Sequence, residues 1–288
     1  MARQKKEKPE SQFRAVMKRF CKNKLALAGL IIFLIIAVLA IFAPIIAPYN
    51  YADMDLRNTY AKPSLQHLCG TDQLGRDIFS RILYGARYSL GLGFSAQIFT
   101  LVFGVIIGSI VGYFGGKVDM IVMRILDIFE SIPGTLLAIV ICTVLGTGFV
   151  NTVIAMGVGG VPMMSRLLRA SIMTVREQEY IEAAAAINCS KFRQIKNYLL
   201  PNAISPLIVT FAMGLGATIM TAAGLSYLGL GVQPPVPEWG AMLSETRKFF
   251  QYYPHVALFP GLAIGITVLA MNLVGDGLRD ALDPKLKN

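Results

Sequence analysis

The sequence predicts an all-α membrane protein with six transmembrane helices, and three observations predict it. Of the 288 residues, 55% are hydrophobic and only 15% are charged, whereas soluble domains carry about 25% charged residues. The mean hydropathy is +0.57. Charge-free apolar stretches of about 20 residues, the length that a bilayer requires, recur along the chain. Disorder, a collagen-like chain and a small disulfide scaffold are excluded by this composition.

The predicted spans follow one another in chain order. Lys24 precedes 23 residues without a charge, which is too long for the apolar core of a signal peptide and predicts a retained first span over 25–47. The other five spans are expected over 88–116, 121–148, 150–165, 203–230 and 256–275. The span over 121–148 carries Arg124, Asp127 and Glu130 near its start, and Pro133 is expected to break its helix.

Lys and Arg residues predict which side of the membrane each connection faces. With six spans both termini share a side, and the first 24 residues hold nine Lys or Arg against two Glu. Such residues stay in the cytoplasm, so both termini are expected there. On this topology 20 of the 27 Lys and Arg residues are cytoplasmic. Topology and anionic lipid therefore account for the net charge of +10, and no nucleic-acid partner is expected.

This topology divides the chain into successive parts. Residues 1–24 form a basic amphipathic segment, expected to lie at the cytoplasmic membrane surface before the first span over 25–47. The remaining parts are an external loop, a five-helix core, a cytoplasmic loop within that core and a cytoplasmic tail, over 48–87, 88–277, 171–202 and 278–288 respectively.

Glycines at helical spacing are expected to let neighbouring spans approach closely. They recur every four residues at Gly104, Gly108, Gly112 and Gly116, and again at Gly261 and Gly265.

The chain is not expected to hold a nucleotide, a metal ion or a disulfide. Gly116-Lys117 lacks the upstream glycine of a phosphate-binding loop. His67, Cys69 and His255 are too few for a metal site. The predicted topology places cysteines 21, 69, 142 and 189 where no pair can bridge across the bilayer. We expect no catalytic residue and no cofactor in this chain.

The sequence of the cytoplasmic loop over 171–202 predicts two short helices. Residues 180–187 are strong helix formers, and Asn188 is expected to take the left-handed conformation that ends a helix. A basic amphipathic pattern then resumes at Lys191 and is expected to stop at Pro201. The alanines of the first helix would let another protein's backbone come close. The alternative is a loop that simply lies on lipid.

This loop resembles the E-A-A-x3-G-x9-I-x-L-P loop of ABC importer permeases. The matching residues are Glu182, Ala183, Ala184, Leu200 and Pro201, with Asn188 in place of the glycine and Tyr198 in place of the isoleucine. Asparagine tolerates positive φ, so the turn is expected to be kept. The resemblance implies a coupling helix that docks on an ATPase subunit. The residues that it assigns to coupling are Tyr180, Glu182, Ala183, Ala184, Asn188, Tyr198, Leu200 and Pro201.

Three further segments resemble the dipeptide/oligopeptide/nickel permeases, and in particular their C-type subunit. They are Gly70 to Arg87, Ser226 to Gly231 with Pro235, Pro237, Trp239 and Gly240, and Asn272 with Gly275 to Pro284. The likeness runs from about residue 13 to the C-terminus and implies a type I ABC importer permease-like bundle in the plasma (inner) membrane of a prokaryote.

The same resemblance implies partners and a cargo. The partners are a second homologous permease subunit, two ATPase subunits that carry ATP and Mg, and an extracytoplasmic solute-binding protein. Peptides are favoured as cargo, while nickel or its chelates, glutathione, opines and sugars remain open. The alternative from another class is an ion-driven secondary transporter, which would need acidic residues at the membrane midplane and usually an internal repeat. A membrane scaffold without transport is a third alternative.

A few polar residues outside the loop are candidates for function. Arg76, Arg81 and Arg87 on the external side either pair with Asp72 and Asp77, contact an external partner or snorkel to the membrane surface. Asp77 is also expected to cap a short helix, and together with Arg76 and Arg81 it is a candidate contact for an external partner.

Two alternative roles remain for Asp127 and Glu130, and two for the loop over 232–254. Asp127 and Glu130 either form a local ion pair with Arg124 or line the translocation path. The loop over 232–254 either packs as a lid on the bundle or faces a binding protein. The sequence alone assigns no substrate-binding residue.

Overall fold

The computed structural model describes residues 12–282, and within that range every named secondary-structure element is helical. The all-α prediction is therefore confirmed for this part of the chain. The elements, in order, are α1 Gln12–Phe20, α2 Lys24–Ile41, α3 Ala43–Ile46, α4 Ile78–Phe114, α5 Gly116–Glu130, α6 Gly134–Leu145, α7 Phe149–Arg176, α8 Glu179–Ala186, α9 Lys191–Gln194, the π-helix η1 Ile195–Leu199, α10 Leu200–Ala203, α11 Ser205–Tyr227, α12 Trp239–Thr246 and α13 His255–Leu282.

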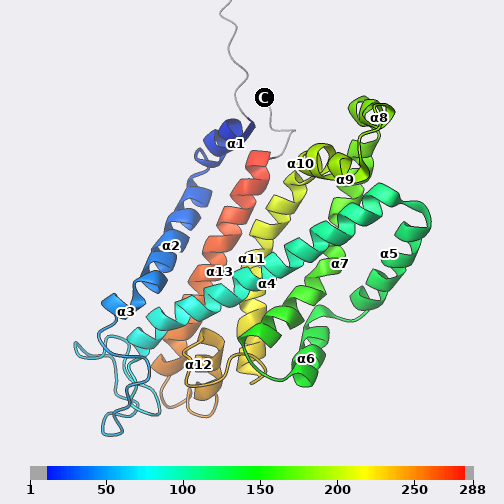
Figure 1. Cartoon of the computed structure of the whole chain (residues 1–288). Coiled ribbons are helices and arrows are strands. Elements are labelled where there is room, and N and C mark those ends of the chain that lie inside the picture. Colours follow the sequence, from blue (N-terminus) through cyan, green and yellow to red (C-terminus); the bar gives the residue numbers. More distant parts are fainter. Residues whose placement is uncertain (1–11, 283–288) are drawn as a thin grey trace, which may run out of the picture.

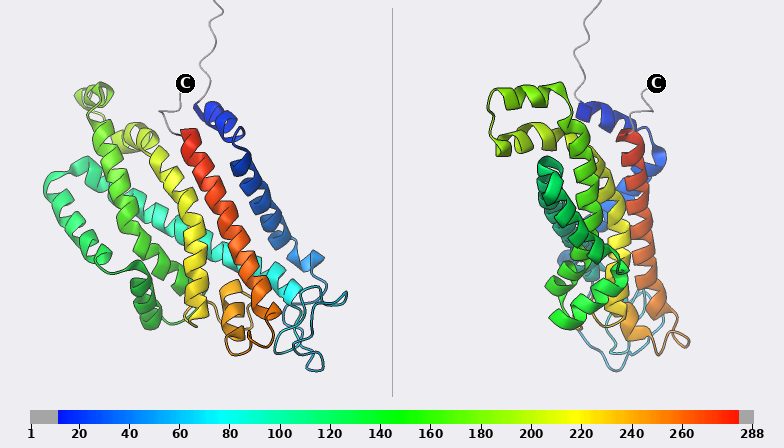
Figure 2. Two further views of the ribbon diagram at one scale, coloured as in Figure 1. Left: turned by 180° about the vertical axis from the view of Figure 1, so that it is seen from behind. Right: turned by 90° about the vertical axis from the view of Figure 1, so that its right-hand side faces the viewer.

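The long helices form a bundle that α4 crosses obliquely (Figure 1). Helix α4 packs along α7, while α13 packs between α2 and α11. The short helices α8, α9 and α10 lie at the same end of the bundle as α1, and α12 lies at the opposite end with the loop that precedes α4 (Figures 1 and 2). The predicted cytoplasmic loop and the predicted external loop thus lie at opposite ends of the bundle.

The predicted number of six spans is not reproduced. Among residues 12–282, four helices are long and apolar enough to cross a membrane, namely α2, α4, α11 and α13, and α5 with α6 makes a fifth if the bent pair is one span. Helix α7 has 28 residues, about 40 Å at 1.5 Å per residue, which is ample for a core of about 30 Å. It is missing from the candidates because polar residues, Arg166 and Arg169 among them, dilute its apolar sequence.

One predicted span is longer than expected. Helix α4 is one unbroken helix of 37 residues that begins at Ile78, so the short helix expected after Asp77 and the span expected over 88–116 are the same element. No proline interrupts this segment, and Asp77 caps its start, as predicted, by accepting a bond from the Ser80 N–H at 2.7 Å.

The third predicted span is broken into two helices, as expected. Helices α5 and α6 meet at an angle of 86°. Pro133 stands directly before α6 and cannot continue α5, because it lacks the N–H donor and restricts the residue before it. The predicted break at Pro133 is confirmed, and α6 is consequently a separate helix of 12 residues.

Three glycines of the predicted ladder pack α4 against α7. A Cβ on Gly108 would lie 2.7 Å from the Ser165 carbonyl oxygen, and Gly104 and Gly112 are as crowded against Met164 and Ile172. Close approach of these two helices therefore requires glycine there.

Three other glycines do not fulfil that prediction within this chain. Gly116 follows the end of α4 with φ of +53° and so leaves the ladder's helix face. A Cβ at Gly261 or Gly265 would meet nothing within 4 Å, because this side of α13 faces away from the other helices of the described chain.

Candidate functional site

The cytoplasmic loop folds as two helical segments around a sharp turn. Helix α8 ends at Ala186, and Asn188 has φ of +57°, the left-handed conformation predicted for it. The Cys189 N–H donates to the Ala184 carbonyl at 3.1 Å, which satisfies one of the free carbonyls at the end of α8. The chain then reverses into α9, as Figure 2 shows.

The second helical segment of the loop continues further than expected. Pro201 does not stop it: α9, η1 and α10 follow without a gap to Ala203. Just before the proline the backbone widens into a π-helix, in which the Leu200 N–H donates to the Ile195 carbonyl. The wider turn makes room for a ring that would clash with the carbonyl of a regular preceding turn, and Pro201 itself needs no donor.

The loop is anchored firmly to the bundle. Ile181 of α8 and Leu199 of η1 are buried together with Leu168 and Ile172 of α7 and Leu207 of α11 in one apolar cluster.

A buried glutamine adds a polar anchor to this cluster. The Gln194 side chain accepts a bond from the Tyr113 hydroxyl at 3.1 Å and donates to the Cys189 carbonyl at 2.8 Å. It thereby ties the turn to the end of α4. This packing favours the predicted pair of helices, docked as a hairpin, over the alternative of a loop that simply lies on lipid.

An apolar surface remains exposed at the tip of this hairpin. Ile187 is 77% exposed and Phe192 74%, while Tyr180 is 44% exposed. Ile187 and Phe192 were not predicted as docking residues, although two large apolar residues on either side of a predicted helix-ending Asn188 are a signal for a docking surface.

The residues predicted for coupling divide between this surface and the anchor. Glu182 and Ala183 are exposed, whereas Ala184 is buried at 5% exposure and faces the anchor, not a partner. Tyr198 and Leu200 are partly buried against the apolar cluster of the anchor, and Pro201 is exposed. The residues that match the pattern therefore fall into two groups: some are exposed on the surface of the loop, and the others pack against the bundle.

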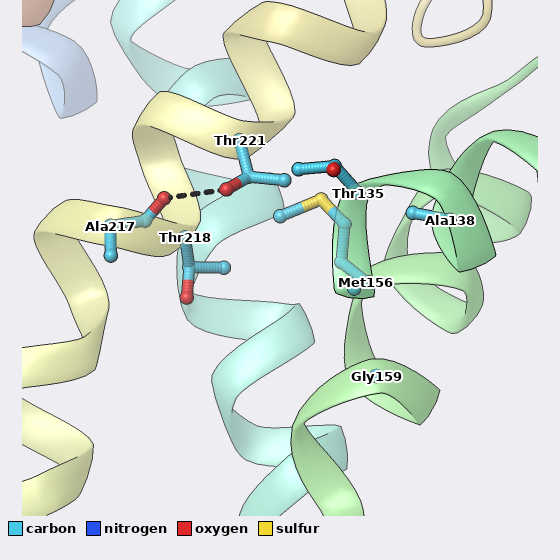
Figure 3. Close-up of a pocket in the computed structure, with 8 residues that line it drawn as sticks. Thr135, Ala138, Met156, Gly159, Ala217, Thr218 and Thr221 are labelled. Atoms are coloured by element: carbon cyan, nitrogen blue, oxygen red, sulfur yellow. Dashed lines mark hydrogen bonds between the residues drawn. The ribbon is translucent and has the colours of Figure 1, made fainter. Parts of the chain in front are cut away.

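A cavity of about 350 Å³ lies at mid-bundle between α6, α7 and α11. Figure 3 shows the side chains of Thr135, Met156 and Thr221 converging on it. The other lining residues are small or carry a hydroxyl: Gly134, Ala138, Gly159, Ala217 and Thr218. Gly134, the first residue after the break at Pro133, is part of its wall.

Asp127 and Glu130 lie at the end of α5, close to that cavity in the chain. The predicted pair of Asp127 with Arg124 is present at 3.7 Å, but the shorter contacts are to Arg166 of α7, which sequence spacing did not indicate. Arg166 lies 2.5 Å from Asp127 and also contacts Glu130. Both acids remain 45% exposed and open to solvent or solute.

Arg76 and Arg81 are each 1% exposed, which corrects the suggestion that they contact an external partner. Both pair with Asp72, which was one of the predicted alternatives. The guanidinium group of each also lies 2.9 Å from a carboxylate oxygen of Glu245 in α12. Asp77 pairs with neither. It caps α4 and lies 2.9 Å from the His67 ring nitrogen.

These contacts join the external loop to the helix α12. Asp72 and Glu245 each pair with both Arg76 and Arg81, so two buried guanidinium groups are balanced by two carboxylates. The partner Glu245 lies 169 residues from Arg76 in the chain and was not predicted.

The first part of the loop over 232–254 packs on the bundle as a lid, which was one of the two predicted alternatives. Trp239 is 1% exposed and donates its ring N–H to the Ile82 carbonyl at 3.0 Å. Glu238, fully buried, accepts from the Ser89 hydroxyl and caps α12 through the Ala241 N–H. Gly85 lets this lid approach, because a Cβ there would lie 2.0 Å from the Pro237 carbonyl oxygen.

The four cysteines are unpaired thiols. Burial, helped by the negative charge of Asp77, raises the pKa of the Cys69 thiol to about 11.

Comparison with known proteins adds the family. Residues 104–288 match the family model described as "Binding-protein-dependent transport system inner membrane component". Residues 11–63 match "N-terminal TM domain of oligopeptide transport permease C".

Curated relatives cover almost the full chain. The dipeptide transport system permease protein DppC of Alkalihalophilus pseudofirmus is 46% identical over 97% of this chain and 94% of its own length. The glutathione transport system permease protein GsiD of Pectobacterium atrosepticum is 45% identical over 96% of this chain and 92% of its own.

A solved structure shares the fold. An inward-facing conformation of the MetNI methionine ABC transporter has a chain that superposes with a TM-score of 0.56 at 20% identity. The match covers 70% of this chain and 97% of that one.

Proposed function

Because this chain belongs to the family of binding-protein-dependent transport system inner membrane components, we propose that it is the permease subunit of an ATP-driven peptide importer. It is a multi-pass membrane protein of this family. The observation that carries the proposal is the docked hairpin α8 to α10, whose exposed apolar tip stands on a rigid anchor at one end of the bundle.

The hairpin supplies a route from ATP hydrolysis to the membrane. We assign ATP and Mg to two partner ATPase subunits, each binding one such hairpin. The anchor joins α8 to α7 and α11, and these two helices also form two walls of the mid-bundle cavity. A displacement of the hairpin would therefore move the cavity walls as rigid bodies, as alternating access requires.

The other partners complete the pathway. The mid-bundle cavity is not fully enclosed by this chain, so a second, homologous permease subunit would complete it. An extracytoplasmic solute-binding protein would deliver the solute to the end of the bundle that carries α12. We place both termini in the cytoplasm of a prokaryotic inner membrane, because the basic residues of α1 and of the hairpin lie at the same end of the bundle.

Peptides are the proposed cargo. The relatives' names specify dipeptide and glutathione transport. The cavity offers hydroxyl groups, a thioether and small side chains. A site that selected nickel would favour His, Cys, Asp or Glu as ligands, and none of these is among the lining residues. Asp127 and Glu130, at the entrance to the α5–α6 break, are proposed to border the translocation path.

Reconstitution tests the proposal. The complex of this chain with its permease partner, ATPase subunits and binding protein is placed in liposomes, and ATP-dependent uptake is measured for dipeptides, longer peptides, glutathione and a nickel chelate. We expect uptake of peptides or glutathione. Uptake of the nickel chelate alone would contradict the cargo, and uptake driven by an ion gradient without ATP would contradict the transporter class.

A charge-reversal variant tests the coupling assignment. Glu182→Lys places a positive charge on the exposed face of α8 without disturbing a buried group. We expect it to insert in the membrane normally and to lose ATP-coupled uptake. Unchanged uptake would remove the hairpin from the mechanism.

A further inference from the structure

A second cavity, of about 690 Å³, lies at the end of the bundle opposite the hairpin. Arg87 and Tyr88 of α4 form one side, Phe149 at the start of α7 another, and Gln233 and Val236 of the lid the third. Three elements that are far apart in the sequence thus meet around one space on the side where the solute would arrive.

This cavity carries an unbalanced positive charge. Arg87 is exposed, and no ion pair connects it to an acid within residues 12–282. The neighbouring Arg76 and Arg81 are different, because both are buried and neutralised by Asp72 and Glu245. No Asp or Glu lines the cavity. Its chemistry therefore favours an anionic group.

The remaining lining residues suit a peptide more than a free inorganic anion. The Gln233 amide nitrogen is held by the Gly229 and Gly231 carbonyls at 2.9 and 3.1 Å, which fixes the side chain in place. Phe149 and Val236 supply apolar walls. A guanidinium, a phenol hydroxyl and apolar walls together match a carboxylate attached to an organic body.

One apolar cluster borders both cavities. Phe149, Val153, Met156 and Val236 pack around the buried Leu92, Ala222 and Val232. Met156 also lines the mid-bundle cavity, whereas Phe149 and Val236 line the outer one. The cluster therefore connects the outer cavity to the mid-bundle cavity, and a solute that moves from one to the other would pass along it.

We propose that Arg87 binds the carboxylate of the incoming peptide in the outer cavity before the peptide passes the apolar cluster. This inference rests on the proposed function, since it names the part of the cargo that the chain itself recognises. Arg87 offers a planar pair of N–H donors, which is the arrangement that holds a carboxylate through two parallel hydrogen bonds.

The test crosses a change in the protein with a change in the peptide. Uptake of alanyl-alanine and of its C-terminal amide is measured in the reconstituted complex, at equal occupancy of the binding protein, for the wild type and Arg87→Gln. Because the binding protein is the same in all four measurements, its own preference cancels when the two ratios are compared. Arg57→Gln is the matched control, because it removes an exposed arginine of the external loop that does not line the cavity.

We expect Arg87→Gln to lower uptake of the free acid about tenfold, the scale of a lost charge-assisted hydrogen bond, and to leave uptake of the amide nearly unchanged. Arg87→Lys should restore part of the difference, and Arg57→Gln should change neither ratio.

Three results would overturn the inference. Equal losses for acid and amide would assign Arg87 to docking of the binding protein. Equal uptake of acid and amide by all variants would show that the carboxylate is not recognised here. No ATP-driven uptake of either form by the wild type would refute the proposed function itself, and with it this inference.

Discussion

Truncation of Ile187 tests whether the hairpin tip is the ATPase-docking surface. Ile187→Ala removes three carbon atoms from a side chain that is 77% exposed, so it leaves no cavity in the chain itself. Each carbon contributes about 0.8 kcal/mol when it is buried in an interface. Scaled by the exposed fraction of 77%, full burial by the partner predicts a loss of about 2 kcal/mol in binding free energy, or about twentyfold in affinity.

The assay is titration of the purified permease pair with the ATPase subunit in detergent, followed by ATP-dependent uptake in liposomes. Leu65→Ala is the matched control, because Leu65 is 99% exposed and belongs to the loop before α4, which lies at the opposite end of the bundle. We expect Ile187→Ala to weaken ATPase binding and Leu65→Ala to have no effect. Equal affinity of wild type and Ile187→Ala would refute the reasoning, since the surface would then bury no partner.

Three further predictions concern the bundle. Glu245→Gln leaves Arg76 and Arg81 with one carboxylate between them, and we expect a loss of about 3–5 kcal/mol in unfolding free energy, measured by thermal denaturation in detergent; an unchanged midpoint would contradict the buried network. Gly108→Val should separate α4 from α7 and prevent stable folding, whereas Gly261→Val, with nothing within 4 Å, should be tolerated by the isolated chain; equal tolerance would refute the close packing. Cys69 has its pKa raised to about 11 by burial and by Asp77, so at pH 8 it should react with iodoacetamide on the order of a hundredfold more slowly than a free thiol. Its rate should rise until the pH passes 11, as followed by mass spectrometry with the exposed Cys21 as reference.

The sequence by itself determined the helical membrane class and the character of individual segments. Composition was sufficient for the class, because a bilayer demands long apolar helices whose signal is local. The turn at Asn188 and the break at Pro133 were predicted for the same reason, since each depends on the backbone chemistry of one residue. The resemblance of the loop added the family, which the comparisons confirmed.

Tertiary structure alone decided which residues meet. Glu245 completes the charge network of Arg76, and Arg166 joins Asp127, across separations of 169 and 39 residues that no local pattern encodes.

Tertiary structure alone also decided which residues are exposed and which glycines contact a neighbouring helix. Ala183 and Ala184 are adjacent and identical in type, yet one is exposed and the other buried, because only the docking of α8 on α7 distinguishes their two directions. Gly104 and Gly261 look alike in their helices, but only one has a neighbouring helix against it. Contacts of this kind depend on the placement of whole helices, which is set by packing over the entire bundle rather than by any single segment.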